Sequence, residues 1–401
     1  MLEIKPILNA LRRSKAGALM LLIQIAITTA IVSNAAYIIY DRIQYLQLDT
    51  GYPEEEIFSF VATTFGQDIN LSQQFELDED MLRNIPGVKN ATIISQVPLS
   101  GSGSASSFHL SADNQDVGGV RAAYTSGDHN IIDTLGVKLV AGRNFTQDDV
   151  VVPDNLEENS IVAITSQTFL DEMFPDGDGL GQTVYLGNTP FQIIGVVEKM
   201  MGPWLKDRRP ENLIIMPFAN AGIYQKIIVR TEPSQRAAIM RQIEDKMLTA
   251  YDKRVIIGLQ GMDQAKQDYN SADILMLRML IVLITVLVLI TALGIFGLTV
   301  FNINKRTKQI GTRRALGARK SAIVKYFIIE NGLICSAGLV VGSGAAVYLG
   351  RILLEEYSLP ALDNSYIVMT AAFVMVVSLL SVLVPANRAS NISPSVATRS
   401  I

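Results

Sequence analysis

Residues 304–320 form a strongly basic segment between two long apolar runs. The segment holds seven Lys or Arg residues and no Asp or Glu. The apolar run before it ends near Val300, and the one after it begins near Ile323. Short loops this rich in Lys and Arg between membrane spans stay on the cytoplasmic side. The segment therefore predicts two membrane spans joined by a cytoplasmic loop.

The composition agrees with a membrane protein that also has a large water-exposed part. Of the 401 residues 49% are hydrophobic and only 18% are charged, below the roughly 25% usual in soluble domains. The formal net charge of -4 gives no indication of nucleic-acid binding. The single cysteine, Cys335, lies in an apolar run. One cysteine cannot form an internal disulfide, which excludes a disulfide-stapled exported domain.

The distribution of Lys and Arg gives one consistent arrangement of four spans. The spans are expected at 16–40, 273–300, 323–350 and 366–385, and Pro385 ends the last one. The cytoplasmic parts are then the N-terminus at 1–15, a basic loop at 301–322 and a tail at 386–401. The external parts are a large domain at 41–272 and a loop at 351–365.

The first apolar run could also be a cleaved signal peptide, because residues 33–35 read Ser-Asn-Ala. The run continues to Tyr40, however, which is longer than the apolar region of a signal peptide usually is. It is long enough to cross a hydrocarbon core of about 30 Å. We therefore expect a membrane span here.

The large domain is expected to be α+β, with one subdomain inserted into another. Residues 55–117 and 217–262 would build the outer subdomain, and residues 118–216 the inserted one. The Ser- and Gly-rich residues 98–107 predict a flexible loop, for which a hairpin tip is preferred to a binding loop. Local patterns predict a helix at 76–84, a helix at 166–174 capped by Thr165, a hairpin turn at 187–190 and a helix at 233–250.

The third span carries a stripe of small residues four positions apart, namely Gly338, Gly342, Ala346 and Gly350. Residues four apart share one helix face, and small ones let a second helix approach closely. The stripe predicts a helix contact, either within the chain or between two chains.

The sequence gives no indication that the chain itself catalyses a reaction or carries protons. There is no P-loop motif, so the chain is not expected to be an ATPase. His109 and His129 are isolated from Cys and have no metal-ligand spacing, and a solvated or structural role is expected for both. No His, Asp or Glu lies at the middle of a span, which disfavours a proton-coupled carrier. Glu330 and Lys325, near the inner end of the third span, are too far apart in helical position to share a face.

Residues 306–318 resemble the R-x-x-E-I-G-x-x-[RK]-A-x-G-A signature of the MacB/FtsX-type permeases of ABC transporters. The resemblance extends over the whole chain, and further matching motifs lie at 8–15, 136–145, 180–182, 195–197 and 385–394. Two departures stand out. Gln309 replaces a frequent Glu, which removes a negative charge from the segment, so a salt bridge from this position to the ATPase is not implied. Residues 397–399 read Ala-Thr-Arg instead of Ala-Leu-Arg.

The resemblance implies a permease without a cofactor of its own, served by a separate ATPase subunit that binds ATP and Mg. It implies two permease chains, identical or different, in the inner membrane of a bacterium, in contact with lipids and optionally with a periplasmic adaptor and an outer-membrane channel. Closure of the ATPases would push on the basic loop at 301–322, which is the expected coupling segment. The spans would pass the motion to the periplasmic domain. The expected coupling residues are Arg306, Gly311, Arg313, Arg314, Ala315, Leu316, Gly317 and Ala318.

Arg313, Arg314 and Gly317 are the expected ATPase contacts. The basic segment would also attract anionic lipid, by about 1 kcal/mol per charge. Export of a peptide, antibiotic or toxic compound is the leading function, with lipoprotein release and FtsX-like regulation as alternatives within the family. From another class, a sensory receptor shares the layout, but it is expected to carry a signalling domain after a span, and only some 16 residues follow Pro385. No short motif names the substrate.

Overall fold

The computed structural model describes residues 15–66, 69–112, 119–151, 161–357 and 362–393. The chain forms two compact units. The membrane unit comprises Met1–Gln47 and Ala272–Ile401, and the large domain comprises Leu48–Ser271. The N-terminal residues 1–14 and the end of the predicted tail, 394–401, lie outside the described residues.

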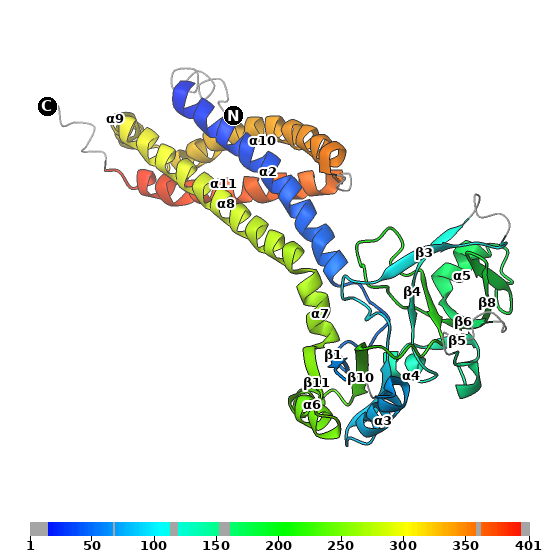
Figure 1. The fold of residues 1–401 in the computed structure, drawn as a ribbon. Coiled ribbons are helices and arrows are strands. Elements are labelled where there is room, and N and C mark those ends of the chain that lie inside the picture. The colour runs from blue at the N-terminus through cyan, green and yellow to red at the C-terminus, as the bar shows by residue number, and fades with distance from the viewer. Residues whose placement is uncertain (1–14, 67–68, 113–118, 152–160, 358–361, 394–401) are drawn as a thin grey trace. The chain divides into compact units, whose positions relative to one another are not determined.

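The membrane unit contains four helices long and apolar enough to cross a membrane. They are α2 (Lys15–Leu46), α8 (Ser271–Lys305), α10 (Lys320–Tyr357) and α11 (Asn364–Ser390). The short helix α9 (Thr307–Ala315) lies between α8 and α10 in the sequence. Four membrane helices and one large α+β domain were predicted, and this architecture is confirmed among the described residues (Figure 1).

Helix α11 does not end at Pro385 as predicted but continues to Ser390. A proline inside a helix removes one backbone hydrogen bond and strains the preceding turn. Here Pro385 is buried, and Ala386 and Ala389 after it lie in the hydrophobic core of the membrane unit. That packing holds the last turn in place despite the missing bond.

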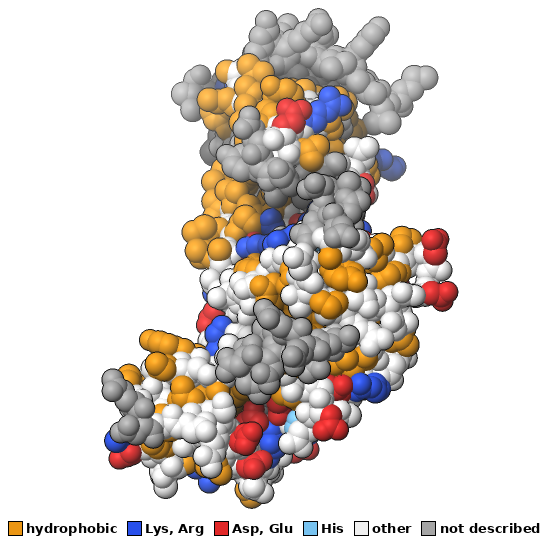
Figure 2. All heavy atoms as spheres, turned by 45° about the vertical axis from the view of Figure 1, so that its right-hand side comes forward, with side chains coloured by type: hydrophobic (Ala, Val, Ile, Leu, Met, Phe, Trp, Pro, Cys, Tyr) orange, Lys and Arg blue, Asp and Glu red, His pale blue; other side chains and the backbone are white. Residues whose placement is uncertain are grey.

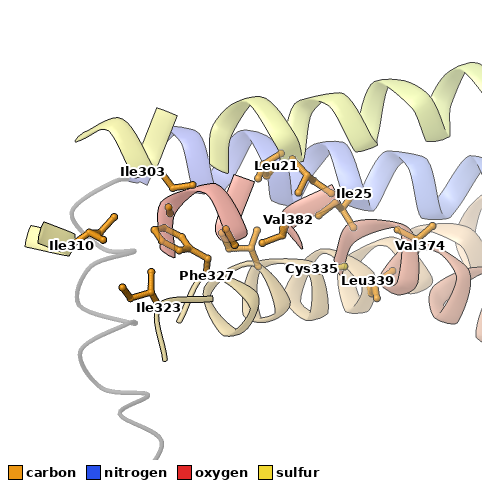
Figure 3. Packing of buried hydrophobic residues seen from close by; sticks show 14 residues of the cluster. Leu21, Ile25, Ile303, Ile310, Ile323, Phe327, Cys335, Leu339, Val374 and Val382 are labelled. Atoms are coloured by element: carbon orange, nitrogen blue, oxygen red, sulfur yellow. The ribbon is translucent and has the colours of Figure 1, made fainter. Parts of the chain in front are cut away.

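The core of the membrane unit is formed mainly by α2, α10 and α11. Leu21 and Ile25 of α2 meet Phe327, Cys335 and Leu339 of α10 in this cluster (Figure 3). Helix α8 adds Ile295 and Ile303, and its other apolar side chains are exposed or only partly buried. In the space-filling view the helices present mostly hydrophobic side chains, whereas charged ones gather on the large domain (Figure 2).

The small-residue stripe of α10 packs against α2 within the chain. A Cβ atom at Gly342 would lie 2.8 Å from the Ala26 carbonyl oxygen and 2.8 Å from the Thr29 Cβ. One helical turn later Ala346 is fully buried, and the Asn34 side-chain amide donates to its carbonyl over 3.1 Å. The absence of larger side chains therefore lets the two backbones approach closely.

The outer subdomain is a four-stranded antiparallel sheet with helices on one face. The strand order is β11-β1-β10-β2, formed by β1 (Ile57–Thr64), β2 (Val88–Ile93), β10 (Tyr224–Thr231) and β11 (Arg254–Gly261). Phe58, Phe60 and Ala62 alternate along β1, so they share one face. On that face α3 (Leu71–Arg83) and α6 (Arg236–Ala250) complete the core. Helix α7 (Met262–Tyr269) follows β11.

The inserted subdomain is a seven-stranded mixed sheet. Its main order is β3-β4-β9-β6-β8-β5, and β7 pairs with β8. The strands are β3 (Ser104–Phe108), β4 (Val120–Ser126), β5 (Leu139–Gly142), β6 (Ile161–Ser166), β7 (Thr183–Leu186), β8 (Thr189–Val197) and β9 (Leu213–Met216). The pairs β4–β9 and β6–β8 are parallel. Helix α5 (Gln167–Met173) contributes Phe169, Leu170 and Met173 to the core.

Two short elements complete the large domain. Helix α4 (Ile131–Leu135) packs against β2 and β10 of the outer subdomain, although it follows β4 in the sequence. The 3-10 turn η1 (Gln147–Asp149) follows β5.

The prediction of a flexible loop at 98–107 is wrong for its second half. Residues Ser104–Phe108 form β3, which pairs antiparallel with β4 in the seven-stranded sheet. Ser and Gly have a low strand propensity, so the local sequence gives no sign of this pairing. Phe108 anchors the strand because it is fully buried in the core of the inserted subdomain. That subdomain therefore begins by Ser104 and not at 118.

Some local predictions shift by a few residues. Ser166, and not Thr165, caps α5, because the Ser166 Oγ accepts from the Phe169 backbone N–H over 3.4 Å. Thr165 belongs to β6 and is buried. The hairpin turn contains only Gly187 and Asn188, since β8 already begins at Thr189. Helix α3 starts at Leu71, where the Asn70 side chain caps it by accepting from the Gln73 backbone N–H.

Candidate coupling site

The basic segment folds into the helix α9 followed by a tight turn into α10. The turn depends on Gly317, whose φ of +88° lies in the left-handed region that favours glycine. The Ala318 N–H donates to the Arg313 carbonyl over 3.0 Å, and the Gly317 N–H donates to the Arg314 carbonyl over 3.1 Å. These two bonds form a Schellman motif, which satisfies the last carbonyl groups of the helix.

Arg306, at the start of α9, faces the interior of the membrane unit. Its Nη1 lies 2.9 Å from the Glu330 Oε2 and 3.1 Å from the Tyr326 hydroxyl oxygen, both on α10. The Glu330 side chain is only 2% exposed. A carboxylate buried without a partner costs free energy. The Arg306–Glu330 ion pair therefore stabilises the placement of α9 against α10, and that placement keeps the pair together. Arg306 thus anchors α9 to α10.

Three further candidate residues lie on the inner side of the segment or support its turn. Ile310 and Gly311 are buried, which places this face of α9 against the helices. The Arg314 Nη1 donates to the Ala318 carbonyl over 2.9 Å, so this guanidinium supports the turn. Ala318 itself is half-buried.

Arg313 lies at the border between the inner and outer faces. Its guanidinium carbon is 5.4 Å from the centroid of the Tyr326 ring, a cation–π distance. Arg306, Arg313 and Tyr326 line a small recess of about 40 Å³ together with Gln309, Ile310, Ile323 and Phe327. The recess is too small for an organic ligand, which typically needs about 300 Å³ or more.

The outer face of the segment is basic and carries one apolar side chain at its tip. Leu316 is 82% exposed, directly before Gly317. The other exposed residues of this face are Lys308, Gln309, Thr312, Arg313, Ala315, Gly317, Arg319 and Lys320. Among the residues that the structure describes, none of its cations has an acidic partner within 4.0 Å, and Lys320 instead donates to the Asn391 side chain over 2.6 Å. This surface, which we call the basic tip, suits an acidic partner with an apolar pocket.

The structure thus divides the eight predicted coupling residues. Arg313, Ala315, Leu316 and Gly317 belong to the basic tip, whereas the other four face inward or support the turn. Glu330 is the partner of Arg306, a contact that was not predicted. A lone acid in an apolar span needs a partner, so Glu330 itself was the signal in the sequence. Its cation lies outside α10, whereas Lys325 lies on the same helix as Glu330.

The large domain contains a second cluster of charges, at the junction of its two subdomains. The Arg83 Nη2 of α3 lies 2.8 Å from the Glu79 Oε2 and 3.2 Å from the Asp128 Oδ2, which follows β4. The Glu79 Oε1 also accepts from the Ile93 backbone N–H over 2.6 Å. Burial and then the nearby Asp128 carboxylate raise the pKa of Glu79 to about 8. The Arg83 guanidinium therefore contacts two buried carboxyl groups, those of Glu79 and Asp128.

This cluster predicts that the large domain loses stability as the pH rises from about 5 to 8. The folded-state pKa of Glu79 exceeds its unfolded value, so the folded state binds a proton that the unfolded state releases in this range. We expect a loss of roughly 3–4 kcal/mol, at about 1.4 kcal/mol per pH unit, and Glu79→Gln should remove most of it because the amide does not titrate. The measurement is thermal unfolding of the detergent-solubilised chain, followed by the fluorescence of the only tryptophan, Trp204, which lies in this domain.

The matched control is Glu76→Gln, one turn earlier on α3, where the side chain is exposed. This variant should keep the pH dependence of the wild-type protein. His129, with its Nδ1 3.7 Å from the Asp128 Oδ2, is present in all three proteins, so the comparison isolates the effect of Glu79. An unchanged slope in Glu79→Gln would contradict the assignment.

The two histidines lie apart, His109 in the inserted subdomain and His129 at the junction of the two subdomains. His109 is buried and bridges to Tyr185 of β7 through its backbone, and His129 is partly exposed beside Asp128. Among the described residues, no group of three His, Cys, Asp or Glu side chains is placed to hold a metal ion.

Two families match this chain. Residues 18–246 match the MacB-like periplasmic core domain, and residues 281–394 match the FtsX-like permease C-terminal region. A macrolide export ATP-binding/permease protein MacB of Neisseria gonorrhoeae is 23% identical over 313 residues, which cover 76% of this chain and 47% of that protein. An uncharacterized ABC transporter permease YknZ of Bacillus subtilis is 24% identical over 328 residues, covering 79% and 78%.

This chain spans about half the length of the MacB relatives that it matches. Among solved structures, the periplasmic region of MacB from Actinobacillus actinomycetemcomitans aligns with 17% identity and a TM-score of 0.35. That alignment covers 52% of this chain and 91% of the other.

Proposed function

The chain belongs to the MacB/FtsX-type permease family, and on that premise we propose that it is the permease subunit of an ABC-type export system with a separate ATPase. The observation that carries the proposal is the basic tip. Its cations face outward without acidic partners among the described residues, and Leu316 projects at its end. A surface of this kind binds a partner through charge complementarity and one apolar anchor.

The packing supports transmission of force from the basic tip into the membrane helices. Arg306 and Glu330 fix α9 to α10, and the Gly317 turn joins the same two elements. Helix α10 in turn packs closely on α2 through its small-residue stripe. Because packed helices move as rigid elements, a push on α9 displaces α10 and α2 together.

Both ends of the large domain continue directly from membrane helices. Helix α2 ends at Leu46, two residues before the domain begins at Leu48, and α8 begins at Ser271, where the domain ends. The α2 and α8 helices also contact each other, with 2.8 Å between the hydroxyl oxygens of Thr28 and Thr291. Motion of the helices is therefore passed to the domain through two covalent connections.

The proposal includes the following assembly. The ATPase subunit binds ATP and Mg, and a second permease chain, identical or different, completes the transporter in the bacterial inner membrane. Lipid or this second chain covers the exposed apolar side chains of α8. Both termini and the basic tip face the cytoplasm, and the large domain faces the periplasm, where an adaptor and an outer-membrane channel are optional partners. The exported substrate is a peptide, an antibiotic or another toxic compound.

The test is purification of the tagged full chain in mild detergent, followed by identification of the proteins that remain bound. We expect a P-loop ATPase to co-purify with the wild-type chain. The double variant Arg313→Glu/Leu316→Asp should reduce its recovery by about ten-fold or more, because it reverses one charge and removes the apolar anchor. Arg314 stays unchanged in this variant because it supports the turn.

The matched control is Lys253→Glu, an equal charge reversal at an exposed residue of the large domain. It should leave ATPase recovery unchanged. If the folded wild-type chain retained no ATPase in several mild detergents, the transporter proposal would be wrong and a receptor would become the better interpretation.

A further inference from the structure

The inserted subdomain contains an open cleft that the coupling mechanism does not use. The cleft has a volume of about 310 Å³, at the lower end of the range for small-molecule sites. Arg121 and Ala123 of β4 form one wall, and the loop before β9 contributes Trp204, Arg208 and Pro210. Trp204 is the only tryptophan of the chain.

The cleft lining carries more positive than negative side chains. The lining contains three Arg and two acidic side chains. The Arg121 Nη2 lies 3.3 Å from the Asp207 Oδ2, and the Arg209 Nε lies 3.6 Å from the Glu172 Oε2. Each carboxylate therefore already has a guanidinium partner. The exposed Arg208 side chain has no acidic partner within 4.0 Å among the residues that the structure describes.

The floor of the cleft is rigid and polar. Asn212 is only 1% exposed, and its Nδ2 donates to the Arg121 carbonyl over 3.2 Å and to the Glu172 Oε2 over 2.9 Å. Its Oδ1 accepts no hydrogen bond from the described residues. A buried acceptor left without a donor is uncommon in folded proteins.

The wall formed by Trp204 is fixed in place. The indole Nε1–H donates to the Gly101 carbonyl over 3.0 Å, so the edge of the ring is held while the side chain remains partly exposed. Gly202 lies where a Cβ would be 3.0 Å from the Ala123 Cβ, so this part of the wall is closely packed. An aromatic surface beside an unpaired guanidinium suits a ligand with an anionic end and an apolar group.

We propose that this cleft binds a carboxylate attached to an apolar group, with the carboxylate at Arg208 and the apolar group against Trp204. Arg is suited to this role because its planar guanidinium donates two parallel hydrogen bonds to a carboxylate. The chemistry is shared by the C-terminal residue of a peptide and by a short fatty acid. The proposal concerns a site other than the basic tip and does not depend on the ATPase.

The test uses the fluorescence of Trp204 in the full chain, solubilised in detergent. The probe is N-acetyl-phenylalanine, and the matched control ligand is N-acetyl-phenylalaninamide, which lacks the carboxylate. We expect a saturable change with the acid at a Kd of about 1 mM, and about ten-fold weaker binding of the amide. Hexanoate distinguishes the two sources, because binding as tight as that of the acetylated amino acid indicates a site for fatty acids.

The variant Arg208→Gln should weaken the binding of N-acetyl-phenylalanine by about ten-fold. Arg208 is exposed, so this change should leave the thermal unfolding temperature unaltered. The control is Arg241→Gln, at an exposed position of α6 in the outer subdomain, which should bind like the wild-type chain. Any one of three outcomes would overturn the proposal. These are equal binding of acid and amide, wild-type affinity in Arg208→Gln, and no saturable change with either probe.

Discussion

Replacement of Arg254 by methionine should lower the free energy of unfolding of the large domain by about 3–5 kcal/mol. The Arg254 Nη1 lies 2.6 Å from the Asp78 Oδ2, and the two side chains are 0% and 1% exposed. The pair joins the edge strand β11 to α3. Removal of the cation leaves the Asp78 carboxylate buried, and among the residues that the structure describes only the Gln74 side-chain amide then donates to it, over 3.0 Å. The measurement is urea unfolding of the full chain in detergent, followed by Trp204 fluorescence.

The double variant Arg254→Met/Asp78→Leu should recover most of this loss. Without either charge, no ion remains buried, and apolar replacements of a buried ion pair are often neutral or stabilising. Arg241→Met is the matched control, because Arg241 is exposed and its loss should change the stability by no more than about 0.5 kcal/mol. A loss below about 1 kcal/mol in Arg254→Met would show that water or a neighbouring group already compensates the carboxylate.

The membrane architecture could be predicted because its signals are local. A run of some 20 apolar residues is by itself enough to predict a span, and the Lys and Arg residues beside it predict its orientation. The turn at Gly317 is likewise a local feature. The helices extend past the predicted spans, as α2 does to Leu46, because a helix continues into polar residues that an apolar run excludes.

The partners of the buried charges could not be predicted, because they are distant in the sequence. Arg254 and Asp78 are 176 residues apart, and Arg306 and Glu330 are 24 apart on different helices. Strand β3 could not be predicted for a related reason. Its residues have little strand propensity, and only the pairing with β4 makes them a strand. The motifs predicted a coupling segment at 301–322, but the position of α10 decides which of its side chains face outward.

Replacement of Arg306 by leucine should detach α9 from α10 while the spans remain folded. Glu330 would then stay buried at 2% exposure without its cation, at a cost of about 3 kcal/mol. The least costly response is for the segment to move away and admit water to the carboxylate. Limited trypsin digestion measures this movement, because Arg313, Arg314, Arg319 and Lys320 are potential cleavage sites. We expect cleavage in this segment to become about ten-fold faster or more, since 1.4 kcal/mol corresponds to ten-fold.

The reverse replacement, Glu330→Leu, should have a smaller effect. The Arg306 side chain is 16% exposed, so without its partner the guanidinium can turn toward water along its flexible stem. The double variant Arg306→Leu/Glu330→Leu leaves no buried charge and should be cleaved almost as slowly as the wild-type chain. Equal cleavage rates in Arg306→Leu and in the wild-type chain would show that the turn at Gly317 and the burial of Ile310 hold α9 without the ion pair. In that case force from the basic tip would pass through the turn alone.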